Sequence, residues 1–330
     1  VSVLRDFSAP VQMKYQYSEA DLAFLLAHET NGFNQWQSAQ ALVNKILLQN
    51  NEPEVYLQAV KKAFLSLVQD DAMLAARILD IPAERELASA VNSEYQPSVM
   101  KQKRDLLKNN LAQFMADNWQ QVYSQLPIES YEDTPQARGK RALRNVVLDM
   151  ALTTGIEEAH DWAYEQYQNA SCMTERLGAL SAMVNHEHPQ KQAVLADFYE
   201  RFNKEALVMD LWFSVQAGDE NASVADIAAL IERKDFDWGT PNRIRAVVGS
   251  FAAQPTKLWS KEGLETYIAV VQKLDETNPV LASRLLQTLS RWYTLAEPVR
   301  AEAKQQLQQL RKQVKSKNVT ESLHTILKAG

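Results

Sequence analysis

The chain has 330 residues, of which 46% are hydrophobic and 23% charged, a composition typical of folded proteins rather than disordered ones. Its formal net charge is −6, and its densest basic stretch, Arg311–Lys317, is short and lies in a helical pattern, which argues against a nucleic-acid partner. No apolar run approaches the roughly 18 residues needed to span a membrane, so we expect no membrane partner.

Cys172 is the only cysteine, so the chain can build neither an intrachain disulfide nor a thiolate zinc cluster. This favours a cytoplasmic location. The opening residues, Val1–Asp6, lack the basic start, apolar centre and cleavage site of a signal peptide. Because the first residue is Val, we expect the chain to be part of a longer protein.

The segment Phe7–Tyr17 alternates apolar Val11, Met13, Tyr15 and Tyr17 with polar neighbours. A period of two is typical of a strand. It predicts either one strand of a sheet that is otherwise absent from this chain, or an extended arm.

From Ser18 onward the hydrophobic period changes to that of a helix. Ser18 with Asp21 has the spacing of a capping box, and Ser223 with Asp226 repeats it. Most prolines fall at or near predicted helix starts, where proline is tolerated. About fifteen helices of about 10–20 residues, joined by short loops, predict antiparallel neighbours. The expected fold is all-α, a HEAT- or armadillo-like helical-repeat superhelix.

The Leu207–Phe213 segment is apolar nearly all round and predicts a buried helix. The Asn278–Trp292 segment predicts a core face of leucines and Trp292, with Arg284 and Arg291 outside that face.

The histidines do not have the spacing of a metal site. A helical zinc site needs two histidines four residues apart with a glutamate after the first. His28 is followed by Glu29, but the fourth position on is Gly32. His186 and His188 are two residues apart, so their rings point to different sides of a helix. The sequence therefore predicts no metal and no cofactor in this chain.

Motifs for nucleophilic catalysis and phosphate binding are also absent from the sequence. Cys172 has no local cysteine-protease signature, and there is no G-x-S-x-G elbow, phosphate-binding loop or dinucleotide fingerprint. We therefore predict no catalytic residue.

One local pattern points to binding. Thr240 and Pro241 have the residue types of a helix N-cap and first position, and Arg243 and Arg245 follow in the first turn, where the helix dipole disfavours cations. With Asn242, they predict an anion-binding helix end, for example for the C-terminus of a peptide. The alternative is that each arginine pairs with a nearby Asp or Glu of the fold.

Four segments together resemble the C-terminal region of the bacterial aminopeptidase N family, and the resemblance runs through essentially the whole chain in the same order. They are Phe7–Val11, Leu207–Trp212, Pro241–Arg245 and Asn278–Arg284. Members of that family are zinc metallopeptidases of the HExxH-plus-glutamate type.

The resemblance implies a division into residues 1–17, the last strand or linker of a missing β-sandwich, and residues 18–330, a helical-repeat domain. That domain would act as a non-catalytic lid that encloses the active-site chamber and contacts peptides through Asn242, Arg243 and Arg245. The zinc ligands and the catalytic glutamate would lie in an upstream domain. The partners implied are the upstream catalytic and β-sandwich domains and peptides. The alternative function is a free-standing helical-repeat scaffold that binds a protein or peptide.

Overall fold

The computed structural model describes residues 2–8, 11 and 15–330, and most of these residues lie in helices. The chain is divided into two compact units. The first contains Val1–Pro82 and Gln102–Lys191, and the second contains Ala83–Lys101 and Gln192–Gly330. The chain therefore enters the second unit briefly, returns to the first, and then completes the second. The all-α class is confirmed.

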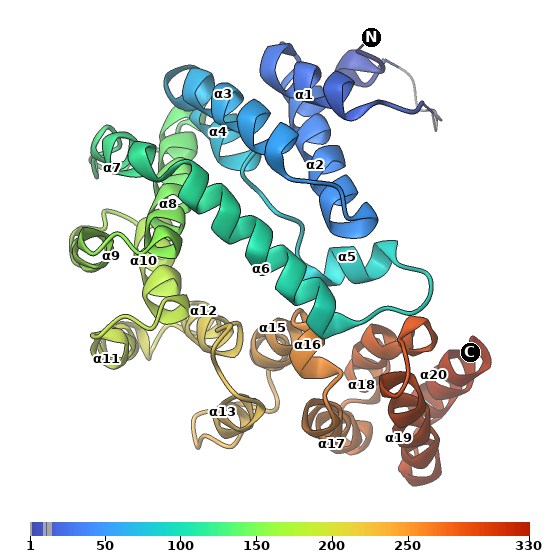
Figure 1. Cartoon of the computed structure of the whole chain (residues 1–330). Helices are drawn as coiled ribbons and strands as arrows, with labels where there is room; N and C mark the ends of the chain where they lie inside the picture. The colour runs from blue at the N-terminus through green and yellow to red at the C-terminus, as the bar shows by residue number, and fades with distance from the viewer. Residues whose placement is uncertain (1, 9–10, 12–14) are drawn as a thin grey trace. The chain divides into compact units, whose positions relative to one another are not determined.

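The first unit is built from helices that pack on their neighbours in the chain (Figure 1). Its elements are η1 (Arg5–Phe7), α1 (Glu19–His28), α2 (Gly32–Gln49), α3 (Glu54–Asp70), α4 (Ala72–Arg77), most of α6 (Pro97–Phe114), α7 (Ala116–Ser124), α8 (Pro135–Thr154), α9 (Glu158–Asn169) and α10 (Met173–Asn185). Helix α8 is central, because α4, α7, α9 and α10 all contact it.

Large aromatic side chains fill the core of the first unit. Trp119 is fully buried, and its ring meets Phe64 edge to face with ring centres 5.7 Å apart. Its indole N–H donates to the carbonyl of Ala112 at 2.8 Å, so burying the ring leaves no unpaired donor.

The second unit continues the same pattern of short loops and adjacent helices (Figure 1). Its elements are α5 (Glu84–Ala90), α11 (Lys191–Phe202), α12 (Ala206–Ala217), α13 (Val224–Ile231), α14 (Pro241–Ile244), the π-helical turn η2 (Arg245–Gly249), α15 (Ser250–Ala252), α16 (Pro255–Leu258), α17 (Lys261–Thr277), α18 (Pro279–Leu286), η3 (Gln287–Leu289), η4 (Trp292–Thr294), α19 (Val299–Gln313) and α20 (Lys317–Lys328).

The predicted stripe along the Asn278–Trp292 segment is confirmed. Leu281, Leu285, Leu289 and Trp292 are buried, whereas Arg284 is exposed and Arg291 is half-buried. The Trp292 indole N–H donates to the carbonyl of Ile326 at 3.0 Å, which joins this stripe to α20.

Both predicted capping boxes are present. The Ser18 hydroxyl accepts from the backbone N–H of Asp21, whose carboxylate accepts from the backbone N–H of Ser18, and Ser223 and Asp226 do the same. Because these bonds pair orphan N–H groups at the helix start, both helices begin where the sequence predicts.

The strand expected over Phe7–Tyr17 is not confirmed. The 3-10 turn Arg5–Phe7 reaches into its start, and neither Val11 nor Tyr15–Tyr17 lies in a strand. Positions 9–10 and 12–14 of this prediction lie outside the described residues. Alternation favours a strand only where a partner strand can accept its backbone hydrogen bonds, and none is found in the described ranges.

The prediction of a buried helix over Leu207–Phe213 is wrong in part. Met209, Trp212 and Phe213 are buried, but Leu207 is 72% exposed.

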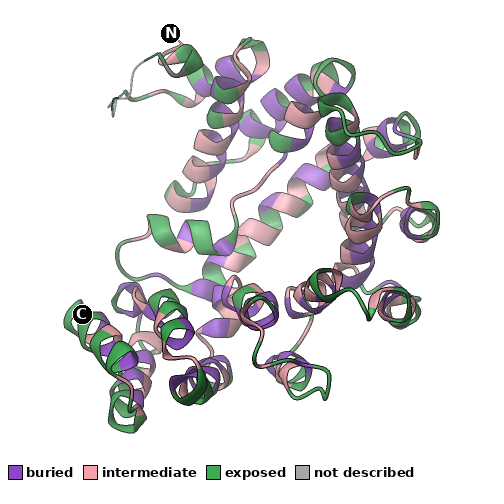
Figure 2. Cartoon of the chain, turned by 180° about the vertical axis from the view of Figure 1, so that it is seen from behind, coloured by how far each residue is buried: buried purple, intermediate pink, exposed green. Residues whose placement is uncertain are grey.

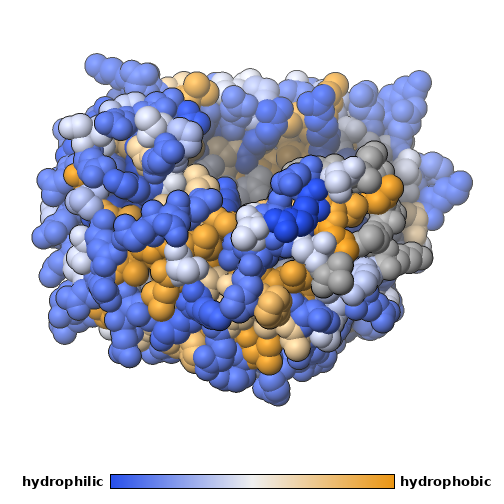
Figure 3. Space-filling view, turned by 90° about the horizontal axis from the view of Figure 1, so that it is seen from above, coloured by the Kyte–Doolittle hydropathy of each residue, from blue (hydrophilic) through white to orange (hydrophobic). Residues whose placement is uncertain are grey.

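Along most helices of each unit, the buried residues form one stripe (Figure 2). The face seen in Figure 3 is mostly hydrophilic, with hydrophobic side chains interspersed. Within the described ranges, no helix is long and apolar enough to cross a membrane.

Two glycines give a direct test of the packing in the second unit. A Cβ at Gly263 would overlap the carbonyl oxygen of Lys257, whereas a Cβ at Gly249 would meet nothing within 4 Å. We expect Gly263→Ala to lower the free energy of unfolding by about 1–3 kcal/mol, because the backbone must move apart. Gly249→Ala, the matched control, should raise it by up to about 1 kcal/mol, since alanine loses less entropy in a helix. Urea unfolding measures both, and equal effects would contradict the close approach.

Candidate functional site

The predicted anion site lies where the loop after α13 enters α14. Asp237 orders this loop: its carboxylate accepts the backbone N–H of Gly239 at 2.8 Å and the hydroxyl of Thr240. These hydrogen bonds, from Thr240 first and then from Gly239, hold the pKa of Asp237 below its usual range. Pro241 occupies the first helical position as predicted, but the Thr240 side chain does not cap the helix. Its hydroxyl is used in the loop instead.

Arg243 is held inside the second unit. Its Nε donates to Oδ1 of Asp210 at 2.6 Å, Nη1 to the carbonyl of Asp235 at 3.2 Å, and Nη2 to the carbonyl of Ala206 at 3.4 Å. The guanidinium also lies over the ring of Phe213, 4.5 Å from its centre. The residue is only 8% exposed. For Arg243, pairing with an acidic residue of the fold is therefore what the structure shows.

Asn242 and Arg245 are exposed on the same turn. Nη1 of Arg245 donates to Oδ1 of Asn242 at 3.0 Å, and Arg245 has no ion pair with any described residue. The two arginines thus differ in burial and in partners. Of these two arginines, Arg243 is buried and ion-paired, whereas Arg245 is exposed.

A π-helical turn, which the sequence did not predict, begins at Arg245. The turn η2 (Arg245–Gly249) follows α14 directly, and Ser214 of α12 donates its hydroxyl to the carbonyl of Ala246 at 3.1 Å. Single π-turns inside helices are frequent at functional sites. Sequence periodicity gave no signal for it, because the buried side chains Val247 and Val248 also fit an ordinary helix.

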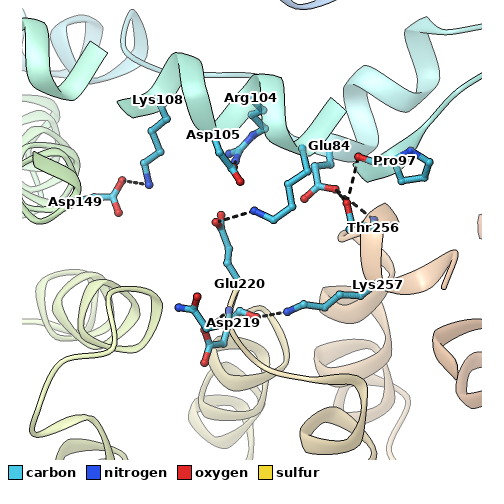
Figure 4. A network of polar contacts seen from close by, with 12 residues as sticks. Glu84, Pro97, Arg104, Asp105, Lys108, Asp149, Asp219, Glu220, Thr256 and Lys257 are labelled. Atoms are coloured by element: carbon cyan, nitrogen blue, oxygen red, sulfur yellow. Dashed lines mark hydrogen bonds and ion pairs between the residues drawn. The ribbon is translucent and has the colours of Figure 1, made fainter. Parts of the chain in front are cut away.

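A second polar group of the same unit surrounds Lys257 (Figure 4). Lys257 is half-buried, and its ammonium donates to the carbonyl of Asp219 at 2.5 Å. Burial lowers the pKa of Lys257, although the nearby carboxylates of Asp219 and Glu220 oppose that shift. Next to it, Glu220 pairs with Lys101 at 3.5 Å.

Glu84 completes this group. It is buried, and its Oε2 lies 3.0 Å from the hydroxyl of Thr256, which also lies 3.3 Å from the carbonyl of Pro97 (Figure 4). No short motif marks these residues, since they come from distant parts of the sequence. Each polar group has a partner in the fold, so the arrangement orders backbone rather than activating a reactant.

His186 and His188 of the first unit each have a polar partner within the fold. His186 lies 2.9 Å from Asp149, which is also 2.9 Å from Lys108 (Figure 4 shows the lysine pair). Burial would raise the pKa of Asp149, but Lys108 and His186 outweigh it and hold that pKa well below its usual range. Nε2 of His188 lies 3.1 Å from the carbonyl of His160, and burial lowers the pKa of His188.

None of these arrangements fits a zinc ion. Across residues 2–8, 11 and 15–330, no three His, Cys, Asp or Glu side chains are close enough to hold a metal. Structural and catalytic zinc sites use at least three protein ligands. Cys172 is a free thiol at the position before α10.

The family described as a domain of unknown function (DUF3458_C) with ARM repeats matches residues 19–328. Aminopeptidase N of Escherichia coli (strain K12) is 31% identical over 303 residues, which are 88% of this chain and 35% of that protein. Aminopeptidase N of Haemophilus influenzae is also 31% identical, over 306 residues, with the same coverage. The chain thus spans about a third of the length of these relatives.

A solved structure, aminopeptidase A of Legionella pneumophila in complex with aspartic acid, has the same fold. It superposes with a TM-score of 0.87 at 24% identity, and the match covers 100% of this chain and 41% of that one.

Arg243 and Arg245 make a matched pair for mutation. Replacing Arg243 with Gln leaves the carboxylate of Asp210 poorly exposed and without its cation, so we expect a loss of about 2–4 kcal/mol in the free energy of unfolding. Arg245→Gln should change it by less than about 0.5 kcal/mol, because Arg245 is exposed. Urea unfolding of both variants measures the difference. Two equal losses would contradict the separate roles.

Proposed function

Since the chain belongs to the DUF3458_C family of ARM-repeat domains, we propose that it is the C-terminal helical domain of a zinc aminopeptidase and has no catalytic residues of its own. The observation that carries this proposal is the match to aminopeptidase N over 88% of this chain but only 35% of those proteins. The remaining length of such a protein would supply the catalytic and β-sandwich domains and the zinc.

The chemistry of the chain supports a non-catalytic role. Hydrolysis of a peptide needs a polarised carbonyl and an activated water, which a zinc ion with three protein ligands and a general base provides in metallopeptidases. His186 and Asp149 pair with each other, His188 lies 3.1 Å from the carbonyl of His160, and Glu84 accepts a hydrogen bond from Thr256. The domain would therefore shape and enclose the chamber in which another domain reacts.

Contact with the peptide would come from Asn242 and Arg245. Both are exposed, and the guanidinium of Arg245 has donors left for a carboxylate. Arg243 would act indirectly: its bonds to Asp210 and to two carbonyl groups fix the turn that presents Arg245. Arg245 would thus bind the peptide carboxylate, and Arg243, two residues earlier, would position Arg245.

The limits of the family match support separating residues 1–17 from the helical domain, because the match begins at residue 19. Residues 2–6 bind the connection between α1 and α2 and the first turn of α2. Asn34 donates to the carbonyl of Val3 at 2.9 Å, and Arg5 donates to the hydroxyl of Thr30 at 2.7 Å. We propose that residues 1–17 link this domain to the preceding one. The single cysteine, Cys172, supports a cytoplasmic location.

The gene itself tests the proposal. We expect an in-frame HExxH motif with a downstream glutamate to be encoded before Val1. We also expect the isolated 330-residue chain, supplied with zinc and a chromogenic amino-acid amide, to show no hydrolysis above background. An initiator methionine directly before Val1 would instead favour the free-standing scaffold, and hydrolysis that a chelator abolishes would contradict the non-catalytic role.

Steady-state kinetics of the full-length protein test the substrate contact. We expect Arg245→Gln to raise KM for short peptides about five- to tenfold with little change in kcat, because one exposed charge-assisted hydrogen bond is lost. KM for an amino-acid amide without a carboxylate should stay the same. The control is Arg284→Gln, which removes an exposed arginine from α18. An equal rise in KM for both substrate types would rule out carboxylate capture.

A further inference from the structure

Helices α19 and α20 border a groove of about 580 Å³ in the second unit. Only residues 314–316 connect the two helices, and the helices pack on each other (Figure 1). A connection this short is typical of an antiparallel helical hairpin, so the end of α20 lies beside the first half of α19. The groove is therefore lined by side chains from both arms of the hairpin.

The lining of the α19–α20 groove is strongly basic. Its cations are Lys304, Arg311, Lys312 and Lys328. His324 and Leu327 also line the groove, and no aspartate or glutamate does. All four cations are exposed, whereas Leu327 is half-buried. This concentration of positive charge contrasts with the chain as a whole, whose formal net charge is −6.

Cations elsewhere on the hairpin are paired, whereas those of the groove are not. Arg300, near the start of α19, pairs with Glu297 at 2.9 Å and with Glu94 at 3.2 Å. Lys317, at the start of α20, pairs with Glu321 at 3.7 Å. The four cations of the groove have no ion pair with any residue in the described part of the chain. An anion placed among them would relieve their mutual repulsion.

The helix dipoles account for only part of this pattern. Arg311 and Lys312 lie in the last turn of α19 and Lys328 in the last turn of α20, where a cation is favoured. Lys304 lies in the interior of α19, where the dipole gives no such benefit. Its ammonium lies 5.5 Å from the centre of the Trp292 ring, whose N–H donates to the last turn of α20 at 3.0 Å. Trp292 thus ties Lys304 to the end of α20.

The cations form two groups along the groove. Lys304 and Arg311 are separated by about 10 Å along the axis of α19, since each residue of a helix rises about 1.5 Å. The hairpin brings Lys328 beside Lys304, and Lys312 is next to Arg311 in the sequence. An extended peptide rises about 3.4 Å per residue. Two carboxylates about three residues apart on such a peptide would therefore reach both groups.

The exposure and the charge of the groove favour a short acidic peptide over other anions. Small-molecule sites bury most of the ligand among mainly apolar side chains, whereas the cations here are exposed. A nucleic acid would extend past the groove over a chain with net charge −6, which would repel it. Phosphate groups favour the fork of an arginine, and three of the four cations are lysines.

We propose that the α19–α20 groove binds an acidic peptide segment. Two of its Asp or Glu side chains, about three residues apart, would pair with the cations at the two ends of the groove. Apolar atoms between them would contact Leu327. The groove is formed by other elements than the turn at Arg245, and this proposal does not depend on the proposed aminopeptidase role.

Fluorescence anisotropy on the 330-residue chain tests the class of partner. The probe is a rhodamine-labelled peptide of three Glu-Ser-Gly repeats, and its control has Gln in place of each Glu. We expect the Glu peptide to bind at least about tenfold more tightly, because several exposed ion pairs are lost in the control. Its affinity should fall as the salt concentration rises. An oligothymidylate of the same net charge and label should bind more weakly than the Glu peptide.

Two double variants test the site itself. Lys304→Gln with Arg311→Gln removes one cation from each end of the groove and should weaken binding of the Glu peptide about fivefold or more. The matched control, Lys234→Gln with Arg284→Gln, removes the same two charges from exposed residues of the same unit that do not line the groove. It should change the affinity less than about twofold. All four residues are exposed, so both variants should fold, which circular dichroism checks.

Three results would overturn the proposal. The first is equal affinity for the Glu and Gln peptides, which would show that the carboxylates are not recognised. The second is an equal loss of affinity in the two double variants, which would show that only the total charge of the chain matters. The third is tighter binding of the oligothymidylate than of the Glu peptide, which would identify the groove as a nucleic-acid surface.

Discussion

The ion pair between Arg243 and Asp210 fixes the start of α14 and keeps the charge of Arg243 inside the second unit. With Nε of Arg243 only 2.6 Å from Oδ1 of Asp210, it joins α14 to α12, and further bonds to the carbonyls of Asp235 and Ala206 secure both flanks. Taking a guanidinium out of water is strongly unfavourable unless its donors are used. Here each nitrogen has an acceptor, so Arg243 serves the fold. Arg245, two residues on, turns outward.

A buried arginine of the first unit is likewise hydrogen-bonded within the fold. Arg144 is 9% exposed, and its three nitrogens donate to Gln166, to the carbonyl of Leu126 and to the hydroxyl of Tyr123. Gln166 in turn donates to the carbonyl of Glu175 at 3.0 Å. These hydrogen bonds tie the side chains of the network to one another and to the backbone. A helical domain with many buried polar residues is therefore not, by that fact, an enzyme.

Features set by neighbouring residues could be predicted from the sequence. The capping boxes at Ser18 and Ser223 need only a residue three positions away, and the stripe from Leu281 to Trp292 needs only the period of a helix. The partner of Arg243 could not be predicted, because Asp210 is 33 positions away and only tertiary packing brings the two together. The strand predicted before Tyr17 is not confirmed, and here the local pattern is insufficient for the opposite reason. A strand is completed by another strand, and a local pattern cannot supply one.

Arg291 shows why contacts between residues far apart in the sequence escape sequence analysis. The sequence predicts that Arg291 lies outside the buried stripe of Leu281, Leu285 and Leu289. The structure agrees, but the segment around Val91 partly covers the Arg291 side chain. Covering removes water from Nε of Arg291 and from the hydroxyl of Tyr95 without giving either a protein partner. Each guanidinium nitrogen of Arg144 and of Arg243 has an acceptor. Arg291 departs from that pattern, because its Nε is buried and has no partner in the described part of the chain.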